Sequence, residues 1–153
     1  MKPTTAVLIA GTAVSAAVAA VGIARVRQEK RTHADRTDIA AARVQMDWLT
    51  QVATNQDLAK LWAPEDMSAE DYMPLLHANR SLCALTLINR LGLISEKQRT
   101  FYAAELMKNK TVRAYWDRFG GLRAEEAAVG KDARDQTITA ILDQAARDYP
   151  AAA

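Results

Sequence analysis

The feature that most restricts this chain is an apolar stretch near its N-terminus that contains no charged side chain. It runs from Pro3 to Ala24 and includes the letters TAVLIAGTAVSAAVAAVGIA. Twenty helical residues rise about 30 Å, which matches the hydrocarbon thickness of a bilayer. We therefore expect residues 1–24 to form a transmembrane anchor, and residues 25–37 to form a polar, basic stalk beside it.

The charges on either side of this stretch predict its orientation. Lys2 precedes the stretch, and four cations follow it closely: Arg25, Arg27, Lys30 and Arg31. Because cations are retained on the cytoplasmic side of a membrane, we expect a single-pass protein of the cell membrane whose C-terminal domain is cytoplasmic. The same four cations are predicted to contact anionic lipid headgroups.

Two other interpretations of the apolar stretch remain open. Lys2 and the small residues around Ala17-Val18-Ala19 also fit a signal peptide, in which case cleavage after Ala19 would release a secreted helical protein. The stretch could instead lie on the membrane surface as a peripheral helix. Its small residues, such as Gly11 and Ser15, allow close helix packing, so a homo-oligomer is a further possibility.

The remainder of the chain predicts an all-α fold. The chain has only 6 Gly and 4 Pro, and its aromatic and β-branched residues do not form alternating runs. We expect a helical domain over residues 38–149, built as an irregular bundle of about five to six helices, and a flexible tail over residues 150–153.

Local signals predict where these helices begin and end. Ser68 to Asp71 and Ser95 to Gln98 resemble capping boxes, and Gly92 is a stop signal. The apolar pattern from Val112 to Phe119 predicts a helix that ends before Gly120-Gly121, followed by a separate short segment over residues 122–129.

Apolar residues recur at helical spacing along the first helix of the domain, which predicts a broad packed face; they include Ile39, Val44, Met46, Trp48, Leu49, Val52 and Ala53. Trp48, Trp62 and Trp116 are the residue type favoured as interface anchors. Two of them, Trp48 and Trp116, fall on apolar stripes, so we expect these two to pack in the core.

The charge of the domain argues against nucleic-acid binding. Residues 38–153 contain 14 Lys and Arg against 16 Asp and Glu, a net charge of −2. A nucleic-acid-binding domain normally carries positive charge on its own surface. The single cysteine, Cys83, is expected to be a buried thiol. We expect no catalytic residues, no cofactor and no metal site, because no recognised catalytic or metal-binding spacing occurs.

One predicted helix is unusually polar for a helix with so many apolar residues. The polar residues form a candidate cleft or interaction face: His77, Asn79, Arg80, Thr86, Asn89 and Arg90. They could line a cleft used by a small enzyme or a ligand-binding domain. They could equally form a row of buried hydrogen bonds or an exposed flank, and this second interpretation is favoured because buried polar groups usually find protein partners.

Three stretches of the chain carry a family resemblance: MDWLTQVATNQDLAKLWAPEDM, LLHANRSLCALTLINRLGLIS and VRAYWDRFGGLRAEEAA. The chain resembles the bacterial domain-of-unknown-function family 6082 over about residues 44–128. The resemblance implies an apolar N-terminus before a helical domain, and it implies no activity and no site residues.

These observations lead to one main functional hypothesis. An anchored, near-neutral helical domain without a catalytic set is typical of a protein-interaction or regulatory module. Its partners would be the membrane and an unknown protein. The enzyme with a cleft along the Asn79–Arg90 face and the secreted helical protein are the alternatives.

Overall fold

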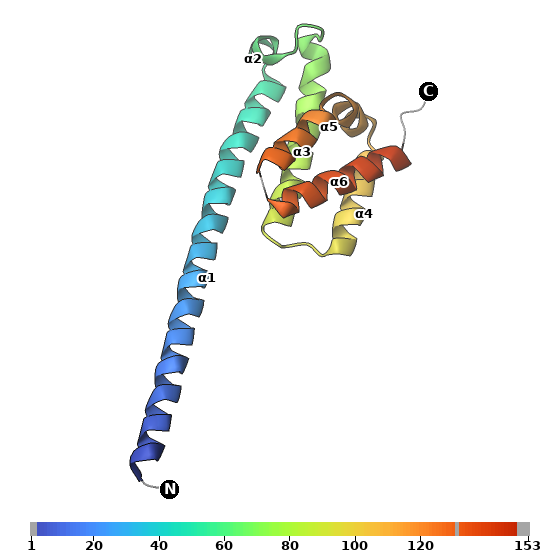
Figure 1. Ribbon diagram of the computed structural model, residues 1–153. Helices are drawn as coiled ribbons and strands as arrows, with labels where there is room; N and C mark the ends of the chain where they lie inside the picture. The colour runs from blue at the N-terminus through green and yellow to red at the C-terminus, as the bar shows by residue number, and fades with distance from the viewer. Residues whose placement is uncertain (1–2, 131, 150–153) are drawn as a thin grey trace. The chain divides into compact units, whose positions relative to one another are not determined.

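A computed structural model describes the backbone of residues 3–130 and 132–149, and the side chains of residues 24–130 and 132–149. Within these residues the chain forms six helices and no strand (Figure 1). The helices are α1 (Pro3–Thr54), α2 (Gln56–Trp62), α3 (Ala69–Arg90), α4 (Glu96–Met107), α5 (Lys110–Gly130) and α6 (Ala133–Asp148). The predicted all-α class is therefore confirmed.

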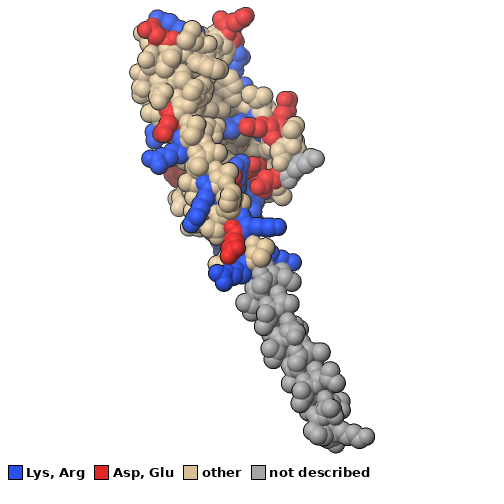
Figure 2. Space-filling view, turned by 90° about the vertical axis from the view of Figure 1, so that its left-hand side faces the viewer, with Lys and Arg blue, Asp and Glu red and all other residues tan. Residues whose placement is uncertain are grey.

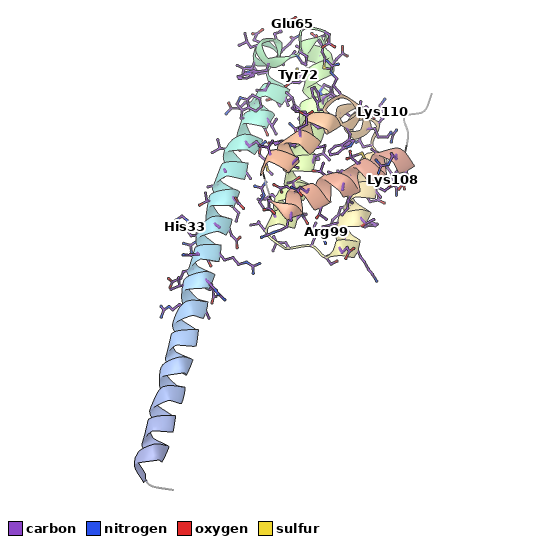
Figure 3. All side chains as sticks on the ribbon, in the orientation of Figure 1. His33, Glu65, Tyr72, Arg99, Lys108 and Lys110 are labelled. Atoms are coloured by element: carbon purple, nitrogen blue, oxygen red, sulfur yellow. The ribbon has the colours of Figure 1, made fainter. Side chains whose placement is uncertain are left out.

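The chain divides into two compact units, Met1–Ile39 and Ala40–Ala153. In the first unit, Arg25 Nε lies 3.2 Å from Glu29 Oε1, as their helical spacing predicts. His33 is exposed on α1 (Figure 3). Within the described residues, no helix combines the length and the apolar character needed to cross a bilayer. The anchor predicted for residues 1–24 lies, apart from Ala24, outside the residues whose side chains are described.

The second unit is built around α3, which contributes side chains to two apolar clusters. The larger cluster joins α3 to α4, α5 and α6 through buried residues such as Leu82, Met107 and Ile138. The smaller cluster joins α3 to α2 and the last turns of α1 through residues such as Leu49 and Leu76. Cys83 belongs to the smaller cluster and is buried, as predicted.

The predicted helix boundaries are confirmed where a capping side chain sets them. The Ser68 side chain accepts from the Asp71 amide at the start of α3, and α3 ends before Gly92, whose φ of 70° suits glycine. At the start of α4, Ser95 and Gln98 form the full reciprocal capping box. Each device supplies partners for amides that the first helical turn leaves unpaired.

The predicted break at Gly120-Gly121 is wrong, because α5 continues through both glycines to Gly130. The reason lies in the packing of Trp116, which is buried and donates from Nε1 to Asp143 Oδ1 on α6 at 2.8 Å. A Cβ atom at position 120 would lie 2.9 Å from that Nε1 atom. Gly120 is therefore a site of close approach inside a helix and not a helix stop.

The expected burial of the first domain helix is wrong for part of its apolar face. Leu49, Val52 and Ala53 are buried, but Val44 and Trp48 are exposed. The smaller apolar cluster includes Leu49, Val52 and Ala53 but neither Val44 nor Trp48, so the apolar pattern extends further round the helix than the surface that this cluster covers. Trp116 is in the core as predicted.

We predict opposite effects for alanine at the two adjacent glycines of α5. Gly120→Ala should lower the free energy of unfolding by about 1 to 3 kcal/mol, because the new methyl group overpacks against the held Trp116 ring. Gly121→Ala meets nothing within 4 Å and should raise stability by up to about 1 kcal/mol, since alanine is the better helix former. Urea unfolding followed by circular dichroism measures both. Equal effects at the two positions would contradict this account of the helix.

Candidate functional site

The six residues of the predicted polar face all lie on α3, but they do not converge on one point. His77 and Arg80 are exposed to solvent. Thr86 donates its hydroxyl to the Leu82 carbonyl within the same helix, at 3.0 Å. The other three residues enter two separate groups of hydrogen bonds, which involve α5 and α6.

The first group joins Asn79 and Cys83 to Arg123 of α5. Arg123 Nη2 donates to Asn79 Oδ1 at 2.8 Å and contacts Cys83 Sγ at 3.0 Å, and the thiol lies 3.4 Å from the same Asn79 oxygen. The guanidinium also approaches Glu126, whose side chain is exposed. A cation from α5 thus occupies the position that a ligand would need beside Asn79.

The titration behaviour of this group reflects its burial and its charges. Burial alone would lower the pKa of the Arg123 guanidinium, but the nearby Cys83 and Tyr115 groups outweigh it and raise that pKa. Burial raises the pKa of the Tyr115 phenol, and the Arg123 charge opposes this rise. Arg123 therefore stays charged, and Tyr115 stays neutral, at physiological pH.

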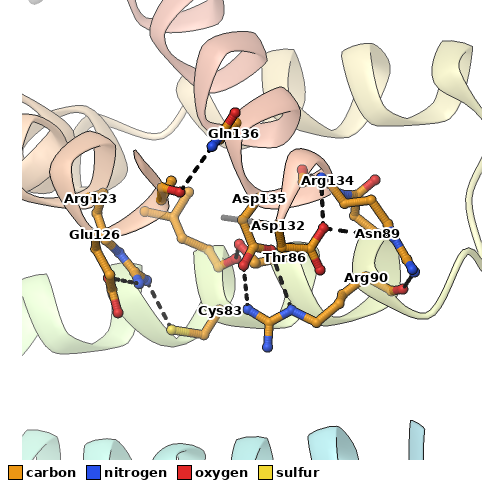
Figure 4. Close-up of polar contacts among 12 residues, drawn as sticks. Cys83, Thr86, Asn89, Arg90, Arg123, Glu126, Asp132, Arg134, Asp135 and Gln136 are labelled. Atoms are coloured by element: carbon orange, nitrogen blue, oxygen red, sulfur yellow. Dashed lines mark hydrogen bonds and ion pairs between the residues drawn. The ribbon is translucent and has the colours of Figure 1, made fainter. Parts of the chain in front are cut away.

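The second group joins the end of α3 to the start of α6 (Figure 4). The buried Asn89 donates to the Arg134 carbonyl at 3.0 Å. Arg90 binds Asp135 through two nitrogens, at 3.3 and 2.6 Å, and its own carbonyl accepts from Arg134. These contacts fix the start of α6 against α3, which is a structural role.

This arrangement favours the interpretation of the polar face as a row of internal hydrogen bonds. An enzyme needs titratable groups that converge on one pocket. Here Asn79 and Arg90 are bonded to different helices, and His77 projects elsewhere on α3. Contacts within the second unit thus account for Asn79, Asn89 and Arg90, whereas His77 and Arg80 are exposed to solvent.

A different surface of α3 forms an apolar groove with α4. The groove has a volume of about 440 Å³. Its lining comes from both helices and the connection between them: Ser81, Ala84, Leu85, Ile88, Ile94, Tyr102, Glu105 and Leu106. Of the lining residues, Leu85 is buried, whereas Ser81, Tyr102 and Glu105 are exposed. An open, mostly aliphatic surface of this kind can accept apolar side chains of a partner.

The groove was not predicted from the sequence, although one local signal exists. Ser81, Ala84, Leu85 and Ile88 share one face of α3 by their three- and four-residue spacing. Ser81 and Ala84 are small, so they leave space beside the larger Leu85 and Ile88. The other wall depends on how α4 packs against α3, and no spacing in the sequence specifies that.

Among residues 24–130 and 132–149, no group of three or more His, Cys, Asp or Glu could hold a metal ion. The model of a family of unknown function, DUF6082, matches residues 4–153. No curated protein and no solved structure matches the chain.

We predict that the two longest-range arginine contacts of α5 differ in their importance for stability. Arg123→Ala should lower the free energy of unfolding by about 1 to 3 kcal/mol, because Asn79 loses a charged donor in a largely buried setting. Arg118→Ala removes an exposed pair with Asp66 and should cost less than about 1 kcal/mol. Urea unfolding at neutral pH compares them. If Arg118→Ala is the more damaging change, the structural role given to Arg123 is wrong.

Proposed function

The chain belongs to the DUF6082 family of unknown function, and from its own sequence and surfaces we propose that it is a membrane-anchored module that binds a helical segment of another protein. The observation that carries the proposal is the apolar groove between α3 and α4. Asn79, Asn89 and Arg90 on the polar side of α3 are already hydrogen-bonded within the protein, whereas the groove offers an apolar surface to a ligand.

The proposed anchor rests on the sequence of residues 1–24. This stretch has a bilayer's length without charge after Lys2, and the cations at 25, 27, 30 and 31 follow it. These cations favour a cytoplasmic C-terminal domain. They are exposed on α1, where they are accessible to anionic headgroups.

The proposed ligand follows from the shape and chemistry of the groove. Two helices form its walls, and the side chains of Leu85, Ile88 and Leu106 are aliphatic. The apolar stripe of an amphipathic helix places side chains at i, i+3, i+4 and i+7, and such a stripe fits a long apolar groove between two helices. Burying these side chains would supply the binding free energy.

The anchor predicts where the full chain is found in a cell. The unmodified chain should remain in membranes after washes with high salt and carbonate, with its intact N-terminus, and protease added outside the cell should not digest its C-terminal domain. Val14→Asp together with Val18→Asp should release it, because each aspartate costs about 3 kcal/mol at the centre of a span.

A matched pair of changes controls for charge alone. Val26→Asp together with Val129→Asp adds the same two charges at exposed positions and should leave the protein in the membrane fraction. A mature protein that begins after Ala19, or a domain digested from outside, would support secretion or outward orientation and overturn this part of the proposal.

The groove predicts binding of a neutral amphipathic peptide. The probe is a peptide of about 18 residues with leucine at i, i+3, i+4 and i+7 and glutamine elsewhere, labelled for fluorescence anisotropy. Ala84→Trp fills the groove and should raise the Kd at least about tenfold. Ala128→Trp, at an exposed position of α5, should leave it unchanged. Equal affinity for the two variants would rule out the groove.

A further inference from the structure

A second surface of the domain combines exposed aromatic side chains with acidic surroundings. Four large apolar side chains are exposed near the end of α1 and on α2: Val44 (71 % exposed), Trp48 (38 %), Leu61 (77 %) and Trp62 (56 %). The rings of Trp48 and Trp62 meet edge to face, with centroids 5.2 Å apart. We call these four residues the tryptophan patch. Figure 2 shows a broad uncharged area in the upper part of the molecular face in view, with charged side chains at its upper edge.

The tryptophan patch is held by rigid structure. Leu49 and Val52, on the same helix as Trp48, are about 1 % exposed and belong to the smaller apolar cluster. Asn55 fixes the start of α2 by accepting from the Asp57 and Leu58 amides, at 3.0 and 3.1 Å. Little conformational entropy would therefore be lost when a partner covers the patch.

Acidic residues dominate the segment that carries the tryptophan patch. Residues 40–71 contain six carboxylates against two cations, Arg43 and Lys60, a net charge of −4; the carboxylates are Asp47, Asp57, Glu65, Asp66, Glu70 and Asp71. One of the six, Asp66, is paired with Arg118 of α5. Glu65 lies at the turn between α2 and α3 and is exposed (Figure 3). The Asp57 side chain is 92 % exposed, although it pairs with Lys60.

This charge selects among the partners that an exposed tryptophan patch could bind. Anionic lipid headgroups would be repelled by the carboxylates. A second copy in a two-fold dimer would place the same acidic segment against itself. The basic segment of a second copy, residues 25–37, has only Val26 as a large aliphatic residue, so it would not cover the tryptophans.

We infer that the tryptophan patch is a docking surface for a basic amphipathic helix of another protein. The apolar stripe of that helix covers Trp48, Leu61 and Trp62, and its Lys or Arg side chains face Asp57 and Glu65. Tryptophan is the residue type most enriched at the centres of protein interfaces. Charge complementarity of this kind raises the association rate and sets specificity. This surface is separate from the α3–α4 groove.

The test compares two peptides that differ only in the sign of their charge. Both have about 18 residues and the same leucine stripe, with lysine at the other positions in one and glutamate in the other. The full chain, in nanodiscs of zwitterionic lipid, should bind the lysine peptide at least about tenfold more tightly. Raising the salt from about 0.05 M to about 0.5 M should narrow this difference, because the charges at the patch are exposed to solvent.

Matched variants locate the binding. Leu61→Ser should weaken binding of the lysine peptide at least about tenfold, whereas Leu122→Ser, at a similarly exposed leucine of α5, should not change it. Asp57→Asn together with Glu65→Gln should reduce the preference for lysine over glutamate and leave binding of the glutamate peptide unchanged or stronger.

Several outcomes would overturn the inference. Equal binding of the two peptides would show that charge does not determine affinity. Equal effects of Leu61→Ser and Leu122→Ser would show that the peptide does not bind at the tryptophan patch. A preference for vesicles with anionic lipid, or a dimer that Leu61→Ser dissociates, would assign the patch to another partner. Loss of lysine-peptide binding in Ala84→Trp but not in Leu61→Ser would place the peptide in the groove, and would leave the proposed function standing without this inference.

Discussion

The structure of the second unit depends on the requirement that α3 be covered on two sides at once. Leu75 and Leu82 pack into the larger apolar cluster, whereas Leu76 and Cys83 pack into the smaller one. A helix that is apolar over most of its surface needs neighbours on most of its surface. α4, α5 and α6 cover one side, and α1 and α2 cover the other. The polar residues of α3 that fall between these neighbours must then be bonded to them, since an unpaired polar group in such a position is costly.

The features of the fold that could be predicted are those that depend on residues close together in the sequence. The starts of α3 and α4 are set by Ser68 and Ser95, whose partners lie three residues away, and the sequence contains this information directly. The continuation of α5 through Gly120 depends on Trp116 and its bond to Asp143, 27 residues away. From the local sequence, a glycine predicts the end of a helix. Only the packed structure shows that Gly120 instead allows the Trp116 ring to lie close to the backbone.

The candidate site was harder to predict for the same reason. The sequence identified Asn79 and Arg90 as members of the polar face, but it did not identify their partners. Asn79 bonds Arg123, 44 residues away, and Arg90 bonds Asp135, 45 residues away. Sequence periodicity assigns a residue to a helix face, but it does not say which helix will cover that face. The exposure of Trp48 has the same origin, because the apolar stripe of α1 is wider than the surface that covers it.

The two proposed surfaces differ in the physical source of their selectivity. The α3–α4 groove is open and mostly aliphatic, so it would discriminate by the size and apolar character of the side chains placed on it. The tryptophan patch consists of exposed side chains in an acidic segment, so the carboxylates around it would discriminate between partners. Burial of apolar side chains would supply the affinity at both surfaces, while charge would act mainly at the tryptophan patch, where salt would weaken it. A partner with a neutral apolar stripe would therefore favour the groove, and one with a basic polar face would favour the patch.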